Sequence, residues 1–395
     1  MPESSLVRRL LLPELHLTNS SYAPSSSRTH LQVEKVSQFE VCPRCATTSQ
    51  SVYDRRTVVV KDAPLREKHV VLHIRKRRFF CRPCGRPFTE PVPGIKKGAR
   101  TTQRYKRSLL WACEKFSDLS SVRKAYACSS GFLYKALYAQ LELERRKRLY
   151  PWPAVLGIDE HYFKRNRRLG IREFASVLVD FKGKRVMEVV KGRSGSELTS
   201  SLSHIPGREN VRFVVLDLCD PFKAFARAFF PHAKLVADKF HVLRLLSPAI
   251  NRRRKAITGD RRSLPLRRLL LRNSRNLDPE RRFALRWWLS KHPELREVYE
   301  MKETLHSFYR IRGPHRAAHA LLTIAERMAR SLLPEIQTLR STLLKWKDEI
   351  LAYFSTRLTN GRTEGFNNKA KLVKRRAYGY RSFQNYRLRL LNACA

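Results

Sequence analysis

Acidic residues are scarce in this sequence. Its 395 residues include 34 Asp and Glu against 81 Lys and Arg, which gives a formal net charge of +47 at pH 7. Because 42% of the residues are apolar and 10% are aromatic, the chain can build hydrophobic cores and is expected to be globular. A folded chain with this charge predicts a polyanionic partner, and nucleic acid is the leading candidate.

Long apolar runs and targeting signals are also missing. No apolar run reaches the length of a transmembrane segment, and no lipidation motif is present. The apolar stretch near the N-terminus is short and is interrupted by Pro13 and Glu14, which argues against a secretory signal. These absences argue against a membrane partner and predict a chain that works in the cytoplasm.

Cysteine is too sparse for a disulfide scaffold, with eight residues in the whole chain. Four of them form two close pairs, "CPRC" and "CRPC", separated by β-rich sequence. Four thiolates on two turns are typical of a closed tetrahedral zinc site that holds a small domain together. We therefore predict that one structural Zn²⁺ is bound by Cys42, Cys45, Cys81 and Cys84. The remaining cysteines lack such spacing and are interpreted as ordinary buried thiols: Cys113, Cys128, Cys219 and Cys394.

The first 150 residues change character twice. Residues 1–40 are rich in Ser, Thr and Leu and predict a partly ordered arm, and residues 41–95 hold the zinc ribbon. Residues 96–150 have helical periodicity and predict three helices in a helix-turn-helix DNA-binding domain. A helical spacer with a solvated basic end would show a similar pattern.

From residue 151 the pattern becomes α/β. Residues 151–248 show three strands in succession and then alternating helices and strands, which predicts a mixed sheet with helices packed on it. Residues 249–355 contain Arg-rich helical segments and no strand pattern, and residues 356–395 contain the final helix and the C-terminus.

Two of the predicted strands end in aspartate, at Asp159 and Asp217. Ligand sites of open sheets collect at the carboxyl ends of strands. Carboxylates there could bind two divalent metal ions, which can cleave a phosphodiester by in-line displacement. Taken singly, each aspartate could instead be a turn or cap residue.

Glu364 is the last acidic residue of the chain and lies in a strongly basic segment. A helix from about Asn360 to Gly379 would place an apolar stripe toward the core, formed by Phe366, Ala370, Val373 and Ala377. The opposite, polar face would then hold Glu364, Asn367, Asn368, Lys371 and Arg375. Such a face suits a phosphate backbone and a metal ion, although a solvated face of a basic protein has the same composition.

Other carboxylates compete for the same role. Glu160 follows Asp159 directly and should point to the opposite side of the strand. Asp238 also ends a predicted strand and is the strongest rival. Asp238 and nearby His241 are predicted to lie behind the metal ligands and support them, although a neutral core histidine is the commoner situation.

The order of these motifs is similar to that of a known family. The segments "GIDEHYFKR", "VVLDLCDPF", "ADKFHV" and "TEGFNNKAKLVKRRAYGYRSFQNYRLRLL" follow the ribbon and the helices. From about Cys42 to the C-terminus, the chain closely resembles the bacterial insertion-sequence L-three family of DDE transposases. The segment at Cys219 departs from the pattern, because a Trp or Tyr is expected near this position.

The resemblance implies an α/β fold of the ribonuclease-H-like type, interrupted by a helical insertion and preceded by a zinc ribbon and a helix-turn-helix. It implies that Asp159, Asp217 and Glu364 bind the catalytic metal, two Mg²⁺ or Mn²⁺ per site. Water would be the first nucleophile and the freed 3′-hydroxyl the second, in phosphoryl transfers without a covalent protein intermediate. Phosphates of the DNA would be positioned by Asn367, Asn368, Lys371, Arg375 and Arg376.

The sequence therefore predicts a DNA transposase that binds the terminal inverted repeats of its own element and cuts and joins double-stranded DNA. A homodimer or higher oligomer on DNA, in the bacterial cytoplasm, is the expected working form. Two alternatives stay open. One is a catalytically silent DNA-binding regulator derived from a transposase. The other is a transposon-associated, RNA-guided nuclease, although there the zinc ribbon lies inside the nuclease domain.

Overall fold

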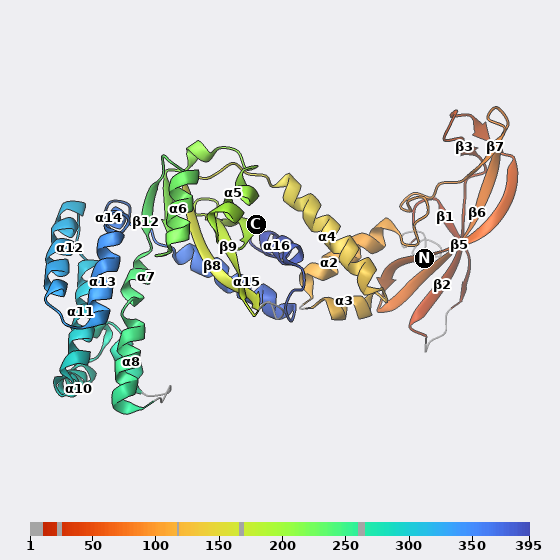
Figure 1. The fold of residues 1–395 in the computed structure, drawn as a ribbon. Coiled ribbons are helices and arrows are strands. Elements are labelled where there is room, and N and C mark those ends of the chain that lie inside the picture. The colour runs from red at the N-terminus through yellow and green to blue at the C-terminus, as the bar shows by residue number, and fades with distance from the viewer. Residues whose placement is uncertain (1–10, 22–25, 117, 166–169, 260–264) are drawn as a thin grey trace. The chain divides into compact units, whose positions relative to one another are not determined.

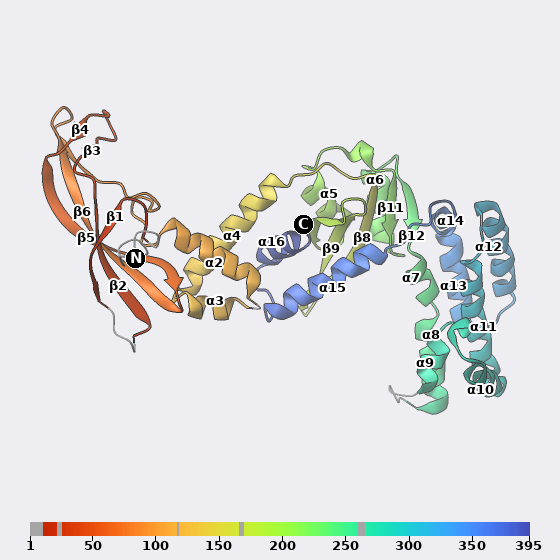
Figure 2. The same cartoon turned by 180° about the vertical axis from the view of Figure 1, so that it is seen from behind.

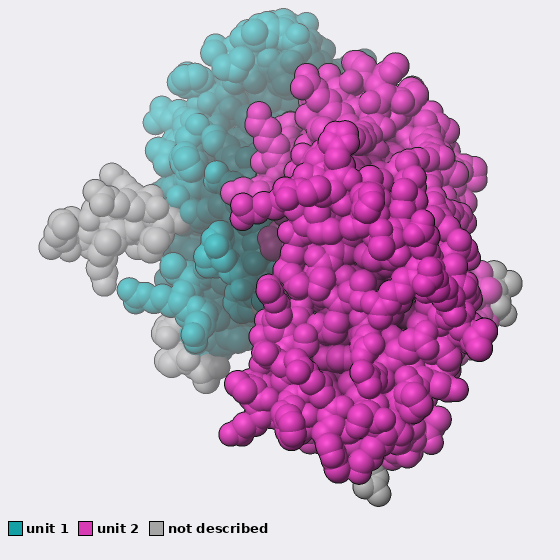
Figure 3. Space-filling model, turned by 90° about the vertical axis from the view of Figure 1, so that its left-hand side faces the viewer, with its two compact units in different colours: residues 1–143, 376–378 teal, residues 144–375, 379–395 magenta. Residues whose placement is uncertain are grey.

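The computed structural model describes the chain except for residues 1–10, 22–25, 117, 166–169 and 260–264. The chain divides into two compact units, coloured separately in Figure 3. The first comprises residues 1–143 and 376–378, and the second comprises residues 144–375 and 379–395. No helix of the described residues is long and apolar enough to cross a membrane.

A five-stranded sheet forms the body of the first unit (Figure 1). Its order is β1-β2-β6-β5, and β7 pairs with the end of β6. Apolar residues alternate along β6, so that Val70, Leu72 and Ile74 are buried on one face and pack with Val33 and Val60. The strands are β1 (Leu15–Ser21), β2 (Arg28–Lys35), β5 (Val52–Leu65), β6 (Lys68–Cys81) and β7 (Arg86–Thr89).

The prediction of a partly ordered N-terminal arm is wrong for part of residues 1–40. Within residues 1–40, Leu15–Ser21 and Arg28–Lys35 are strands, and β2 pairs in parallel with β6 of the predicted ribbon. Leu11, Leu12 and Leu15 are buried in the core of this sheet. The Ser- and Thr-rich composition suggested weak order, but the apolar residues among them complete the core of a sheet that begins well before the first cysteine.

Three helices follow the sheet: α2 (Gln103–Lys115), α3 (Leu119–Ala125) and α4 (Ser130–Lys147). Thr102 caps α2 and also donates its hydroxyl to Asp62 of β5, at 2.7 Å. Asp118 caps α3, and Ser129 accepts from the first turn of α4. Side-chain caps therefore mark where each helix begins, and the Asp62 contact ties the helices to the sheet.

The second unit is built on a mixed sheet of order β10-β9-β8-β11-β12. Strands β8, β9 and β10 form an antiparallel meander, whereas β11 and β12 run parallel to β8. The mixed sheet predicted from the sequence is therefore present. Its strands are β8 (Val155–Arg165), β9 (Arg172–Asp180), β10 (Arg185–Lys191), β11 (Phe213–Leu216) and β12 (Lys234–Ala237).

Helices cover both faces of this sheet. Figures 1 and 2 show α5 (Gly195–Leu202) and α6 (Asp220–Phe229) on one face and α15 (Gly361–Arg376) on the other. The C-terminal α16 (Phe383–Ala393) packs on the β10 side, where Arg387 pairs with Glu188. Burial of β11 from both faces explains its run of apolar residues, "FVVL", of which three are buried.

Helices also fill the segment between β12 and α15. They are α7 (Lys239–Arg244), α8 (Ser247–Thr258), α9 (Pro265–Leu271), α10 (Pro279–Ser290), α11 (Pro293–Phe308), α12 (Pro314–Ala329), α13 (Pro334–Lys345) and α14 (Lys347–Thr356). Six of these helices carry Pro in their first turn, where its missing N–H costs nothing. The last of them, α14, returns to lie against β12.

Candidate catalytic carboxylates and zinc site

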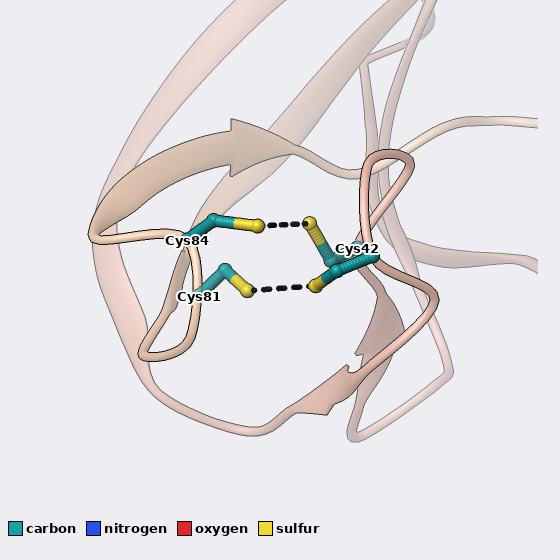
Figure 4. A group of neighbouring side chains, drawn as sticks. Cys42, Cys81 and Cys84 are labelled. Atoms are coloured by element: carbon teal, nitrogen blue, oxygen red, sulfur yellow. Dashed lines mark hydrogen bonds between the residues drawn. The ribbon is translucent and has the colours of Figure 1, made fainter.

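The four predicted zinc ligands converge on one point. Cys42 and Cys45 lie in the turn between β3 (Glu40–Val41) and β4 (Thr48–Ser49). Cys81 is the last residue of β6, and Cys84 lies in the turn that leads to β7. Figure 4 shows the two turns facing each other. Cys42 Sγ lies 4.0 Å from Cys84 Sγ. Cys45 Sγ lies 3.4 Å from Cys81 Sγ, and all four sulfurs lie within 4.8 Å of one another. A tetrahedral Zn²⁺ with Zn–S bonds of about 2.3 Å requires sulfurs roughly 3.8 Å apart, so the residues fit the metal.

The electrostatics of these thiols suit a metal. The side chain and backbone of Thr47 hydrogen-bond with Cys45 and lower the pKa of that thiol to about 6. Hydrogen bonding with Cys45 and burial raise the pKa of Cys84 to about 12. Sulfurs this close share protons in the absence of a cation, and a cation that replaced those protons would relieve their mutual repulsion.

Three aspartates occupy the same register position on three parallel strands of the second unit. Ile158 of β8 pairs with Leu216 of β11, and Leu216 pairs with Ala237 of β12. The next residues are Asp159, Asp217 and Asp238. Asp217 and Asp238 follow their strands directly, as predicted, but β8 continues to Arg165. Asp159 is therefore inside its strand, because β9 continues to pair with β8 beyond the end of β11.

Asp159 and Asp217 lie close enough to perturb each other. Burial and then the neighbouring charge of Asp217 raise the pKa of Asp159 from about 3.8 to about 8. Asp159 is 9% exposed and receives hydrogen bonds from its neighbours at both oxygens. Two buried carboxylates that compete for a proton are a donor set of the kind that divalent cations occupy.

Asp238 and His241 lie beside Asp217, and the oxygens of Asp238 are already used. His241 Nδ1 lies 3.0 Å from both Asp217 Oδ1 and Asp238 Oδ2. Burial opposes protonation of His241, but these hydrogen bonds outweigh it and raise the pKa of His241 to about 10. Asp238 also accepts from the backbone N–H of His241 and of Asn360. Asp238 therefore anchors two chain segments. Ligand atoms of Asp217, Asp238 and His241 also lie within 4.8 Å of one another, so the supporting role of Asp238 stays a prediction.

The segment that carries Glu364 packs directly on β8. Gly157 lies two residues before Asp159 and so faces the same side of the strand. A Cβ at Gly157 would stand 2.4 Å from Thr363 Oγ1 of α15 and 2.4 Å from Phe181 Cε1. Only glycine allows the helix to approach this close, and the approach brings α15 to the face of the sheet that holds Asp159.

Two asparagines connect this segment to the carboxylates. Asn360 Nδ2 donates to Asp217 Oδ1 and to the carbonyl of Ile158, both at 3.2 Å. Asn367 Nδ2 donates to Asp159 Oδ2 at 2.7 Å. Glu364 lies four residues after the first asparagine and three before the second, so all three share one helical face. The Glu364 side chain is exposed and has no ion-pair partner among the described residues.

The predicted faces of this helix are partly wrong. Asn367 was expected on an exposed polar face, but it is 6% exposed and bonded to Asp159. Ala377 was expected in the core stripe, but it is exposed, whereas Ala370 is buried and Phe366 and Val373 are half-buried. The polar residues of this helix that are exposed as predicted are Glu364, Asn368, Lys371 and Arg375, and Arg376 is exposed as well. Simple apolar periodicity missed that Thr363 and Asn367 pack toward polar atoms of the sheet.

A cavity of about 310 Å³ opens beside Asp217 and His241. Cys219 and Phe222 line it in place of the bulkier residue that the resemblance implies near this position. Glu160 also lines the cavity and pairs with Arg193 at 3.2 Å. Among the other cysteines, Cys113 and Cys394 are buried as expected, whereas Cys128 and Cys219 are only partly covered.

The sequence interpretation missed Asn360 and His161 as members of the site. Asn360 bonds to Asp217 and Asp238, and His161 lies buried two residues after Asp159. A usable signal was present for Asn360, because it precedes Glu364 by one helical turn. His161 offered no such signal, since its partner Tyr386 is 225 residues away.

Comparison with known proteins identifies the family of this chain. A profile of the transposase family DDE_Tnp_ISL3 matches residues 156–390, which is more than half of the chain. A second profile, for the zinc-finger of transposase IS204/IS1001/IS1096/IS1165, matches residues 38–84 and includes all four clustered cysteines. The first profile implies use of a divalent metal, and the second suggests that the cysteine cluster binds Zn²⁺.

Two curated relatives extend the similarity over most of the chain. The transposase for insertion sequence element IS1001 of Bordetella parapertussis is 26% identical over 374 residues, covering 91% of this chain and 90% of the relative. The transposase for insertion sequence element IS1557 of Mycobacterium tuberculosis is 23% identical over 362 residues, covering 80% and 76%. The protein therefore belongs to the ISL3 family of DDE transposases, enzymes that cleave DNA in transposition.

Proposed function

We propose that this transposase binds the terminal inverted repeats of its insertion sequence and cuts and joins DNA at a site formed by Asp159, Asp217 and Glu364. The observation that carries the proposal is the shared register of Asp159 and Asp217 on adjacent parallel strands, with α15 packed against them through Gly157. Glu364 lies on that helix between two asparagines that bond to the aspartates.

The donor set of this site fits hard divalent cations. Bound Mg²⁺ or Mn²⁺, two per site, would supply the Lewis acidity that an in-line displacement at phosphorus requires. Asp159 and Asp217 offer carboxylate oxygens from a rigid sheet, and Glu364 offers a third carboxylate free of ion-pair partners among the described residues. Exposed Asn368, Lys371 and Arg375 on the same helix would hold the phosphates of the DNA strand beside this site.

The remaining parts of the proposal concern architecture and binding. The sheet of antiparallel β10-β9-β8 and parallel β11-β12, with helices on both faces, supports a ribonuclease-H-like catalytic domain. The three capped helices α2 to α4 support a helix-turn-helix that reads the terminal repeats together with the zinc ribbon. We further propose that the enzyme works as a homodimer or higher oligomer on DNA in the bacterial cytoplasm.

Purified protein incubated with its flanking DNA and Mg²⁺ tests the proposal. Mapping of the nicked ends should place cuts at the borders of short inverted repeats, and freed 3′-hydroxyls should become joined to target DNA. Asp217→Asn should bind the same ends without cutting them. Binding without cleavage by the unaltered protein under these conditions would instead identify a silent DNA-binding regulator.

A further inference from the structure

Asn367 occupies the centre of a buried polar chain behind the proposed catalytic site. Its Nδ2 donates to Asp159 Oδ2 at 2.7 Å, which leaves its Oδ1 turned away from the carboxylate. That Oδ1 is buried and has no hydrogen-bond partner among the described residues. An unsatisfied buried oxygen is costly, so an adjacent donor is needed to hold the amide in this orientation.

His161 is the neighbour that can supply this donor. It is 7% exposed, and its Nδ1 likewise has no hydrogen-bond partner among the described residues. His161 lies two residues after Asp159 and so on the same side of β8. Burial lowers the pKa of His161, and an interaction with the Asn367 side chain opposes that effect. On the far side of the ring, His161 Nε2 lies 2.5 Å from the hydroxyl of Tyr386, a fully buried residue of α16. The two unsatisfied atoms are complementary, because one can donate and the other can only accept.

We propose that Tyr386 and His161 are positioning residues that orient the Asn367 amide and, through it, the carboxylate of Asp159. In this arrangement the Tyr386 hydroxyl donates to His161 Nε2, His161 Nδ1–H donates to Asn367 Oδ1, and Asn367 Nδ2 donates to Asp159 Oδ2. Every hydrogen bond then points toward the carboxylate. A flipped Asn367 amide would place its oxygen against Asp159 and its NH₂ group against the donor of His161. The hydrogen bonds from Tyr386 and His161 make that orientation unfavourable.

This row of hydrogen-bonded side chains also connects three separate elements to one proposed metal ligand, Asp159. His161 lies on β8, Asn367 on α15 and Tyr386 on α16. Ring contacts hold Tyr386 in place, with centroids 5.2 Å from Phe163 and 5.4 Å from Tyr380. Removal of the Tyr386 hydroxyl alone should therefore leave the packing intact and change only the orientation of the His161 ring and the Asn367 amide. This inference rests on the proposed function, because it assigns Asp159 to the metal.

The test uses Tyr386→Phe, measured without DNA first. Mn²⁺ binding to the full-length protein, followed by electron paramagnetic resonance, should weaken about tenfold, as is typical when hydrogen bonds behind a metal ligand are lost. The Mn²⁺ concentration that gives half-maximal DNA cleavage should rise by a similar factor, and binding of the DNA ends should not change. Tyr309→Phe is the matched control, because the Tyr309 hydroxyl is buried without a partner among the described residues.

Two further variants separate positioning from general damage. His161→Asn keeps a donor near the place of Nδ1 and should retain more Mn²⁺ affinity than His161→Gln, whose amide reaches the place of Nε2. In an Asn367→Ala background, Tyr386→Phe should add no further loss, because both act through one path. Unchanged Mn²⁺ affinity in a folded Tyr386→Phe, or fully additive losses, would overturn the inference. If the inference failed in this way but the unaltered protein still cleaved DNA in the same assay, the proposed function would not be contradicted.

Discussion

Glu364 is the residue on which the proposed chemistry depends most directly. Glu364→Gln preserves the size of the side chain and the helix but removes the charge that would hold a divalent ion. Cleavage and strand transfer should fall by at least about a thousandfold, an expectation based on the strongly non-additive loss seen when one member of a catalytic group is removed. Gel-based cleavage assays measure the loss, and a filter-binding assay should show that binding of the DNA ends survives.

Asp238→Asn is the internal control for this experiment. Asp238 anchors Asn360 and His241, so partial cleavage activity is expected. Complete loss in Asp238→Asn together with full activity in Asp217→Asn would show that the second carboxylate had been assigned to the wrong aspartate.

Asp159 makes stability depend on pH in a defined direction. Its pKa in the folded, metal-free protein is raised to about 8 by burial and by Asp217. Because the pKa of Asp159 is higher in the folded state, its proton binds the folded state more tightly than the unfolded state. The resulting stabilisation is complete below about pH 4, falls as the pH rises, and is gone above about pH 8, where both states have lost the proton. Asp159→Asn stays neutral and should escape this loss.

Thermal melts in the presence of a metal chelator should therefore show that the difference in melting temperature between Asp159→Asn and the unaltered protein changes with pH. Relative to the unaltered protein, the melting temperature of Asp159→Asn should rise between pH 4.5 and pH 8.5, by about 2–4 °C for each kcal/mol of relief. Added Mg²⁺ at pH 8.5 should stabilise the unaltered protein and have little effect on the variant. A difference that does not change with pH would mean that Asp159 is ionised in the metal-free protein.

At the scale of elements, the contact between α15 and β8 decides whether the site exists. Gly157→Ala would place a methyl group 2.4 Å from Thr363 Oγ1 and would push the helix away from the sheet. We expect cleavage to fall at least about tenfold, since displacements near 1 Å are costly at a catalytic site. The melting temperature should fall as well, and crosslinking should detect unchanged binding of DNA by the first unit.

Gly365→Ala is the matched control on the same helix. A Cβ at Gly365 meets no heavy atom within 4 Å, and alanine is favoured over glycine in a helix by roughly 1 kcal/mol. Its cleavage activity should be unchanged and its melting temperature equal or higher. If both glycine variants lost activity equally, the effect would belong to the helix and not to its approach to β8.

The zinc ribbon provides a second prediction at this scale. A protein in which both Cys45 and Cys84 are replaced by Ser should contain no zinc by mass spectrometry, whereas the unaltered protein should contain about one Zn²⁺ per chain. Cys128→Ser should retain the metal, because Cys128 lies outside the cluster. The double variant should lose the unfolding transition of its first unit, since the folding of small ribbons depends on metal binding. A metal-free protein with an unchanged melt would contradict this.

At the scale of the whole molecule, the net charge of +47 should dominate affinity. Binding to the terminal repeat should weaken steeply between about 50 and 200 mM salt, because each neutralised phosphate releases counterions. Lys371→Ala should lower the slope of log affinity against log salt by about one and weaken specific and nonspecific DNA equally. Fluorescence anisotropy over a salt series measures both, and a slope near zero would exclude phosphate contacts as the main source of affinity.

Several features of this protein follow from its sequence alone. The spacing of Cys42, Cys45, Cys81 and Cys84 predicts the cysteine cluster, because four thiolates on two CxxC turns are typical of a tetrahedral zinc site. Apolar runs that end near Asp159 and Asp217 predict an aspartate at the end of each of two strands, since buried strands have a strong local signature. The net charge predicts a nucleic-acid partner, and the resemblance of the motifs to the ISL3 family implies a DNA transposase. These properties are encoded in residues close together along the chain.

Only the tertiary structure decided the rest. Asp159 lies inside β8, the supposed arm contributes two strands, and Asn367 turns inward to bond with Asp159, 208 residues away. Periodicity along one helix cannot reveal these contacts, because whether a polar side chain faces solvent depends on what the opposing element offers. The glycine at position 157 and the buried hydroxyl of Tyr386 acquire their meaning in the same way, from partners that only the folded chain brings within reach.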